Sequence, residues 1–231
     1  MTGKANDPAT SPAVEDYLKA IYQLTQEGRP VSTSAIADRL GVAAASVTGM
    51  LKRLAEQDLV EHVRYRGASL TGSGEATAIR LVRRHRILEL FLVSVLGYTW
   101  DTVHDQAERL EHAASDELID RMAHILGEPA VDPHGDPIPA AAGPFHEPDW
   151  PALSELDTDR PAVLRRVSDA DPDVLRYLAD LGLMPGVHIV VTHHAPFGGP
   201  VTVRAGVQNH VLGRALCKTI QVEPIEMATT P

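Results

Sequence analysis

The hydrophobic positions of the first 60 residues recur every three or four positions, which is the spacing of amphipathic α-helices. This pattern predicts one helix over residues 11–26, which Ser11 and Pro12 can begin, and two shorter helices over 31–42 and 43–57. Gly41 lies between the two short helices. Two short helices separated by a tight turn with a glycine are typical of a helix-turn-helix.

Residues 59–71 have the pattern of a β-hairpin with a basic tip, which completes a winged helix. The second short helix exposes small hydroxyl and apolar side chains that allow close approach to the major groove of DNA. Its basic residues, with those of the hairpin tip, can hold phosphates. A winged helix used only for protein contacts is the alternative. The residues expected at DNA are Thr33, Ser34, Ala44, Ser46, Thr48, Gly49, Lys52, Arg53, Arg64 and Arg66.

After the hairpin, the pattern predicts a long helix over 71–96 whose second half is apolar nearly all round. One small domain needs less apolar surface than this, so we expect a homodimer interface there. A further helix is expected from Val103 onward and another over 115–126, whereas residues 127–161 are rich in Pro, Gly and Ala, as linkers are. The last 70 residues read as short strands interrupted by one helix, which predicts a small β-barrel.

The composition indicates the cellular compartment of the protein and shows that charge is distributed unevenly along the chain. The formal net charge is −10, but residues 30–86 hold nine Lys and Arg against five Asp and Glu, whereas residues 81–160 hold six against sixteen. No apolar run approaches the roughly 20 residues that span a bilayer, and the first residues are polar, so we expect neither a membrane partner nor a signal peptide. The single cysteine, Cys217, excludes an intrachain disulfide and favours the reducing cytoplasm.

Candidate chemistry gathers on the helix that begins near residue 103. Read at 100° per residue, His104, Glu108, Glu111 and His112 fall within roughly a third of its circumference. His85 and Glu89 form a second pair, four residues apart on the preceding long helix. Nitrogen and carboxylate donors without thiolate suit a divalent transition metal. A solvated helix face with ordinary His and Glu pairs fits the same pattern.

The spacing of these residues excludes two classes of metalloenzyme. A zincin helix needs His-Glu-x-x-His or its inverted form, but the residue three before Glu111 is Glu108. Di-iron bundles need Glu-x-x-His on two helices, and neither Glu89 nor Glu108 has a histidine at that distance. The face therefore predicts binding without catalysis, and we expect no enzyme.

The order of these parts resembles the diphtheria toxin repressor family of metal-dependent transcriptional regulators, with its iron and manganese branches, and the resemblance covers nearly the whole chain. It implies a multidomain, mainly α fold with small β elements: a winged helix-turn-helix domain (1–75), a helical dimerisation and metal-binding domain (76–146), a linker (147–161) and an SH3-like, FeoA-like β-barrel (162–231). The residues that carry it are 14–22 (VEDYLKAIY), 36–40 (IADRL), 84–89 (RHRILE), 103–105 (VHD), 111–112 (EH) and 132–139 (DPHGDPIP).

The resemblance also implies two sets of metal ligands. The family's primary site corresponds to Asp16, Glu108, Glu111 and His112. Its ancillary site corresponds to His85, Glu89 and His104, completed in longer members by side chains near the start of the barrel's helix. The nearest candidates for that completion are Asp171 and Asp173.

Two departures from the family pattern concern the metal. Iron-type members have Met and Cys where this chain has Asp16 and Glu108, and carboxylate in place of sulfur favours the harder Mn(II). Lys19 stands where short manganese regulators have a further Glu, which argues against their closely spaced metal pair. We therefore expect Mn(II) first and Fe(II) as the alternative, with Zn(II) or Cd(II) binding in vitro.

The function expected from the resemblance is metal-dependent regulation, by repression, of metal-homeostasis genes. The metal would pull mutually repelling carboxylates together and fix the two winged helices of a homodimer on a palindromic double-stranded operator. No organic small-molecule substrate is expected. The rival interpretations are a metal-dependent hydrolase and a metal-buffering scaffold whose winged helix does not bind DNA.

The role of the barrel stays open between three possibilities. It can supply ancillary ligands, add dimer contacts or bind a proline-rich segment of its own chain, where Pro137, Pro139 and Pro144 lie. His193 and His194 are interpreted as surface residues at a strand end, because adjacent side chains in a strand point to opposite faces.

Overall fold

The computed structural model describes residues 11–28, 31–63 and 67–225. The chain divides into two compact units. The first unit comprises the residues up to His85 together with Leu110–Asp116 and Pro139–Phe145, and the second unit comprises the rest.

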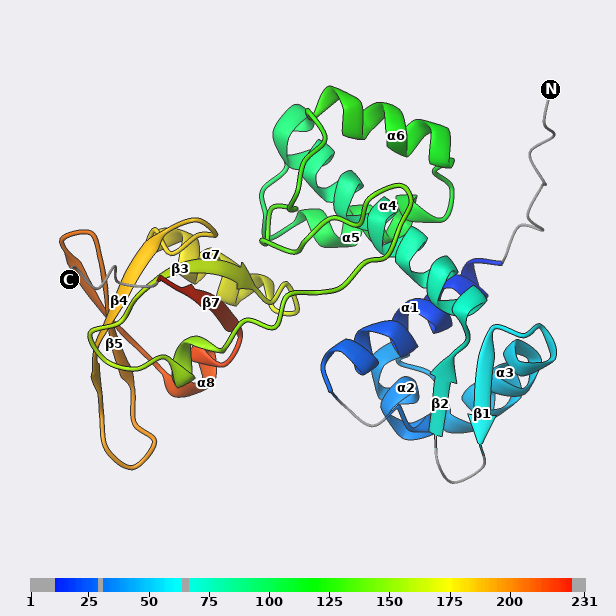
Figure 1. The fold of residues 1–231 in the computed structure, drawn as a ribbon, viewed down its shortest axis with the longest axis horizontal. Helices are drawn as coiled ribbons and strands as arrows, with labels where there is room; N and C mark the ends of the chain where they lie inside the picture. Colours follow the sequence, from blue (N-terminus) through cyan, green and yellow to red (C-terminus); the bar gives the residue numbers. More distant parts are fainter. Residues whose placement is uncertain (1–10, 29–30, 64–66, 226–231) are drawn as a thin grey trace, which may run out of the picture. The chain divides into compact units, whose positions relative to one another are not determined.

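The first unit contains the predicted winged helix-turn-helix (Figure 1). Ser32 caps the second helix, because its hydroxyl accepts a hydrogen bond from the backbone N–H of Ala35 at 3.1 Å. Gly41 ends that helix in the left-handed conformation, with φ of 63°, which glycine adopts without steric cost. The elements are α1 (Pro12–Gln26), α2 (Thr33–Leu40), α3 (Ala44–Glu56), β1 (Val60–Val63) and β2 (Gly67–Leu70).

The core of the first unit forms where the predicted apolar faces meet. Leu18 and Ile21 of α1 are fully buried, as are Ile36 of α2 and Leu51 of α3. The two strands pair antiparallel, with Val60 opposite Leu70. Helix α1 therefore shares one hydrophobic core with the helix-turn-helix. A displacement of α1 would displace α2 and α3 with it.

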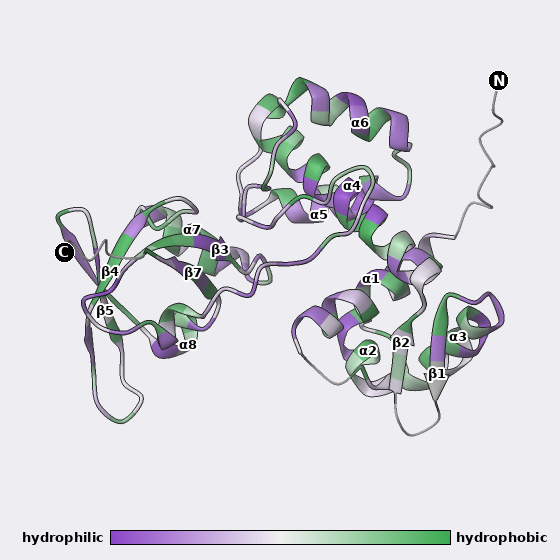
Figure 2. Ribbon diagram, in the orientation of Figure 1, coloured by the Kyte–Doolittle hydropathy of each residue, from purple (hydrophilic) through white to green (hydrophobic). Residues whose placement is uncertain are grey.

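One long helix, α4 (Gly72–Leu96), and two shorter ones, α5 (Val103–Glu111) and α6 (Asp116–Ile125), follow. Hydrophobic and hydrophilic residues interchange along α6, as an amphipathic helix requires (Figure 2). Apolar side chains stay exposed at Val95 (50%), Leu96 (59%) and Ile125 (67%). Among the described residues, no helix has the length and apolar character needed to cross a membrane.

The C-terminal part of the second unit is an antiparallel five-stranded sheet in the order β6-β5-β4-β3-β7. Its core includes Leu153 and Leu156, which the sequence analysis had assigned to a linker. A 3-10 turn and the short helix α8 were not anticipated from the sequence. The elements are η1 (Leu153–Glu155), β3 (Pro161–Val167), α7 (Pro172–Asp180), β4 (His188–His194), β5 (Val201–Ala205), β6 (Gln208–Leu212), α8 (Arg214–Cys217) and β7 (Ile220–Pro224).

Candidate metal centres and nucleic-acid interface

The first candidate metal centre lies in the first unit, between α1 and the C-terminal end of α5. Asp16, Glu111 and His112 each offer one ligand atom, and these atoms lie within 4.8 Å of one another. The Nε2 atom of His112 is 2.9 Å from Oδ1 of Asp16. Glu111 is fully buried, at 0% exposure. Two carboxylates and an imidazole in this arrangement can hold a divalent cation.

Basic groups neutralise Glu111, the buried acid of the first centre, in the described structure. Lys19 donates hydrogen bonds from Nζ to both carboxylate oxygens of Glu111, at 3.0 and 2.9 Å. The Nδ1 atom of His85 lies 2.6 Å from Oε2 of the same carboxylate. Burial raises the pKa of Glu111, but His85 and Lys19 outweigh burial, and the net shift is downward. Glu111 therefore stays ionised, which is the form that binds metal.

Glu108, the other residue expected at the primary site, lies on α5 one turn before Glu111 and His112. Its Oε1 atom is 3.8 Å from Nε2 of His104. The helix thus keeps Glu108 on the face that carries Glu111 and His112. It is not a member of the group formed by Asp16, Glu111 and His112.

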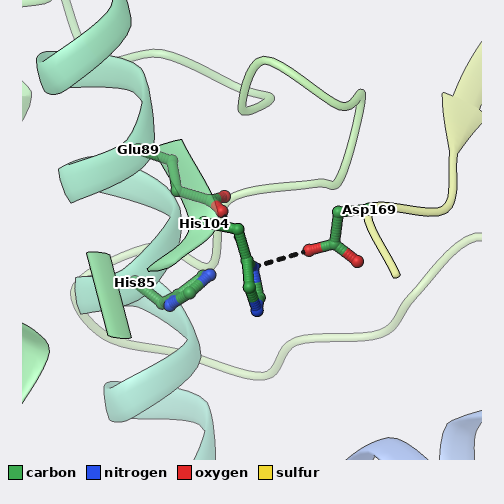
Figure 3. Close-up of side chains that lie close together, drawn as sticks. All are labelled: His85, Glu89, His104 and Asp169. Carbon is green, nitrogen blue, oxygen red and sulfur yellow. Dashed lines mark hydrogen bonds and ion pairs between the residues drawn. The ribbon is translucent and has the colours of Figure 1, made fainter. Parts of the chain in front are cut away.

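The second candidate centre lies in the second unit, where α4, α5 and the segment after β3 converge (Figure 3). The Nδ1 atom of His104 is 3.2 Å from Oε1 of Glu89 and 2.9 Å from Oδ2 of Asp169. Burial lowers the pKa of His104, but the bonds to Asp169 and Glu89 dominate and raise it to about 10. His85 precedes Glu89 by one turn of α4, and Figure 3 draws its ring beside them.

His134 and Asp132 extend the second centre, with His134 near the other carboxylate oxygen of Glu89. The Nδ1 atom of His134 lies 3.6 Å from Oε2 of Glu89, and Glu89, Asp132 and His134 again offer ligand atoms within 4.8 Å of one another. Oδ1 of Asp132 accepts backbone hydrogen bonds from His134 and Asp136. One loop therefore brings a carboxylate and an imidazole to Glu89.

The hydrogen bonding of His134 fits a metal ligand. Its Nε2 lies 2.6 Å from the backbone oxygen of Trp100 and must donate, because a carbonyl only accepts. Its Nδ1 is buried without a hydrogen-bond partner. An imidazole whose second nitrogen donates to a backbone carbonyl is the usual arrangement around protein-bound metals. A cation between His134, Glu89 and Asp132 would bond to this nitrogen in place of its proton.

Asp171 and Asp173, the barrel residues predicted to complete the ancillary site, make other contacts in the structure. Asp171 caps α7, because its carboxylate accepts the backbone N–H of Asp173 at 2.9 Å. Asp173 is exposed and ion-paired with Arg176. Asp169, two residues before the cap, is the residue that reaches His104. The placement differs because a capping aspartate must turn back toward its own helix.

Three members of the second candidate centre, Asp132, His134 and Asp169, were not predicted from the sequence. In the sequence, residues 132–139 carry part of the family resemblance and lie within the linker-like stretch 127–161. An Asp-x-His pair in a Pro- and Gly-rich segment was the available signal. Asp169 gave no local signal, because its role depends on where the barrel packs.

The expected nucleic-acid contacts on α2 and α3 face outward. Ser34, Ala44, Ser46, Thr48, Gly49, Lys52 and Arg53 are exposed, and Thr33 is half-buried. The inner face of α3 is occupied by Val47, Leu51 and Leu54, which are fully buried. Arg64 and Arg66, assigned to the hairpin tip, lie outside the described residues.

Three sequence families match successive parts of the chain. Residues 9–68 match the iron dependent repressor N-terminal DNA binding domain, and residues 71–140 match the iron dependent repressor metal binding and dimerisation domain. Residues 152–224 match the FeoA domain. The iron-dependent repressor IdeR of Mycobacterium tuberculosis is 31% identical over 223 residues, covering 91% of this chain and 96% of IdeR. The diphtheria toxin repressor of Corynebacterium glutamicum is 28% identical, covering 92% and 96%.

Solved structures are similar over nearly the full length. A manganese-dependent transcriptional repressor in complex with manganese superposes with a TM-score of 0.86 and 41% identity, covering 92% of this chain and all of the other. The repressor ScaR with bound Cd2+ superposes with a TM-score of 0.78 and 33% identity, covering 92% of this chain and 99% of ScaR. The predicted fold class, with its DNA-binding, helical and barrel parts, is confirmed by these matches.

Proposed function

Since the chain belongs to the family of metal-dependent transcriptional repressors that includes IdeR and the diphtheria toxin repressor, we propose that it is a Mn(II)-responsive repressor with two metal centres per subunit. The first centre is Asp16, Glu111 and His112, with Glu108 as a fourth donor. The second is Glu89, His104, Asp169 and His134, with Asp132 beside them and His85 one turn away on α4.

The position of Asp16 carries this proposal. Asp16 lies on α1, the helix that packs with α2 and α3, whereas Glu111 is the last residue of α5 and His112 follows it. A dication bound to all three fixes α1, and with it the helix-turn-helix, against the segment that follows α5. Binding energy at the metal is thereby converted into DNA affinity, with a coupling of about 1–3 kcal/mol per site.

The chemistry of both donor sets favours Mn(II), with Fe(II) as the second candidate. Both contain carboxylate and imidazole, and the lone cysteine, Cys217, is buried in the core of the C-terminal sheet. Similarity to a manganese-dependent repressor supports this order, and similarity to IdeR supports Fe(II). Zn(II) and Cd(II) are expected to bind in vitro, as they do to ScaR.

The DNA partner we propose is a palindromic duplex operator bound by a homodimer in the cytoplasm. The exposed small side chains of α3 approach the bases while Lys52 and Arg53 hold phosphates. The exposed apolar residues Val95, Leu96 and Ile125 are available for the dimer contact. Metal-homeostasis genes are the proposed targets.

The test is a fluorescence-anisotropy titration of the promoter upstream of this gene, without metal and with Mn(II), Fe(II) or Zn(II) under anaerobic conditions. We expect the wild type to bind tightly only with metal. His112→Ala should lose the metal stimulation, whereas His193→Ala, an exposed barrel residue, should retain it. Equal metal stimulation in the two variants would reject the first centre.

A second variant tests the choice of metal. Asp16→Met replaces a hard oxygen ligand by a soft sulfur and should shift the preference from Mn(II) toward Fe(II). An unchanged ratio of the two metal affinities would count against the argument from ligand softness.

A further inference from the structure

Two arginines and two acids form a closed ring of ion pairs beside the second metal centre. Nη2 of Arg86 on α4 lies 3.0 Å from Oδ1 of Asp136 and 2.7 Å from Oε1 of Glu147. Arg166 on β3 contacts the same two acids: its Nη2 is 2.6 Å from Oδ1 of Asp136, and its Nη1 is 3.2 Å from Oε2 of Glu147. We call this set the arginine–carboxylate ring.

The ring joins four segments that are far apart in the sequence: α4, the loop with Asp136, the connection with Glu147, and β3. Arg86, Asp136 and Glu147 are each at least nine-tenths buried at the side chain, and Arg166 is one-third exposed. Charge-assisted bonds of guanidinium to carboxylate are strong and directional, and this burial shields them from screening by salt. The ring therefore holds β3 in a defined place on α4.

The loop that carries Asp136 also packs directly on β3. The backbone N–H of Val167 donates to the backbone oxygen of His134 at 2.9 Å. A Cβ atom at Gly135 would lie 1.7 Å from the backbone oxygen of Arg165, so only glycine allows this approach. His134 and Val167 are thus tied together through their main chains.

These contacts place the barrel's metal ligand. Arg166 lies three residues before Asp169, and Asp136 lies two residues after His134. The ring holds equal numbers of positive and negative charges, so it adds no net positive charge to balance Glu89, Asp132 and Asp169. Its effect on the second centre is positional.

We propose that the arginine–carboxylate ring is a positioning device that docks the barrel on α4, so that Asp169 meets Glu89, His104 and His134 as a metal ligand. Docking and metal binding at the second centre then strengthen each other, because each favours the same arrangement of β3. The inference rests on the second centre of the proposed function. It makes Arg86, Arg166, Asp136 and Glu147 determinants of metal affinity although none of them needs to touch the metal.

Adjacent arginines on β3 provide a matched pair of variants. Arg166→Gln removes one side of the ring, whereas Arg165→Gln removes an arginine whose ion pair, with Glu223, belongs to the sheet alone. Equilibrium dialysis of the purified full chain against Mn(II) should give two metals per subunit for the wild type and for Arg165→Gln. For Arg166→Gln, we expect one unchanged metal and one that binds about tenfold more weakly, the size typical of lost outer-sphere support.

Hydrogen–deuterium exchange supplies a readout that does not depend on counting metals. Mn(II) should slow exchange at the Val167 amide in the wild type and in Arg165→Gln, and much less in Arg166→Gln. Glu147→Gln, which keeps both arginines and changes only one charge, should behave like Arg166→Gln, so that a folding defect in one variant does not decide the result.

Two results would overturn the inference, and they are distinguishable. If Glu89→Gln loses one metal but Arg166→Gln and Glu147→Gln bind both metals as Arg165→Gln does, the second centre stands and the ring does not control it. If Glu89→Gln loses no metal, the second centre itself is rejected, and the role of the ring is rejected with it.

Discussion

Lys19 brings a positive charge into the ligand set of the first centre, where it bonds both oxygens of the fully buried Glu111. The sequence predicts repelling carboxylates in the metal-free state, but Glu111 already has a cationic partner. Lys19→Gln would leave a buried carboxylate short of a counter-charge. The free energy of unfolding of the metal-free protein should fall by about 3 kcal/mol.

Mn(II) should restore much of this loss, because the dication replaces the missing ammonium charge at Glu111. Urea denaturation with and without Mn(II) measures both effects. Lys52→Gln, at an exposed position on α3, is the control and should change stability by less than about 0.5 kcal/mol. A Lys19→Gln protein as stable as that control would contradict the assigned role of the ion pair.

The raised pKa values of two histidines in the second centre predict that metal binding there releases protons. Burial lowers the pKa of His134, but Glu89 and Asp132 outweigh burial and raise it to about 9, and the pKa of His104 is raised to about 10. Both rings are therefore protonated at pH 7 without metal, and both must lose a proton to become ligands. We expect release of about two protons at this centre and an affinity that rises between pH 6 and 8.

Calorimetry of Mn(II) binding in buffers of different ionisation enthalpy counts these protons, and His134→Gln should reduce the number by about one. The same raised pKa values stabilise the metal-free protein fully below the ordinary value of 6.5, and this contribution is lost as pH rises toward 9 and 10. Heats of binding that do not depend on the buffer would show that these rings are neutral before metal arrives.

Helix α3 is the element on which DNA affinity depends in the proposed function. Its inner face is fixed by Val47, Leu51 and Leu54, so its outer side chains are presented on a rigid support. Lys52→Gln should weaken binding to operator and to unrelated duplex alike and lower the slope of log affinity against log salt by about one, because one phosphate contact is lost. Lys218→Gln, an exposed barrel lysine, should leave the slope unchanged. A loss confined to the operator would instead assign Lys52 to the bases.

The helices were predictable as elements because each contributes a face of regular periodicity. Residues 11–26 and 71–96 were expected as helices, and α1 (Pro12–Gln26) and α4 (Gly72–Leu96) begin one residue later. The loop at 132–136 was not predictable, because its order comes from side chains that bind its own backbone and from the approach of Gly135 to β3. Such contacts leave no periodic pattern in the sequence, so they cannot be predicted from it.

At the scale of the whole molecule, the exposed end of α4 predicts the oligomeric state. Val95→Glu places a charge among Leu96 and its apolar neighbours and should shift the protein from dimer to monomer in sedimentation velocity. The variant should still bind Mn(II) but lose most of its operator affinity, since two half-sites are no longer held together. Val207→Glu, on the exposed β5–β6 turn, is the control and should remain dimeric. A dimeric Val95→Glu protein would exclude this surface as the contact.

The amino-acid sequence by itself determined the helix-turn-helix, the helical faces that carry His85, Glu89, His104, Glu108, Glu111 and His112, and the presence of carboxylates at positions 16 and 108. These features follow from spacing and residue type, which are local properties of the chain. Only the tertiary structure decided that Lys19 bonds Glu111, that Nδ1 of His134 is buried 3.6 Å from Oε2 of Glu89, and that Asp169 contacts His104 whereas Asp171 caps α7. Each of these contacts depends on packing between segments that are distant in sequence. Asp169 and Asp171 are only two residues apart, yet the first contacts His104 and the second caps α7.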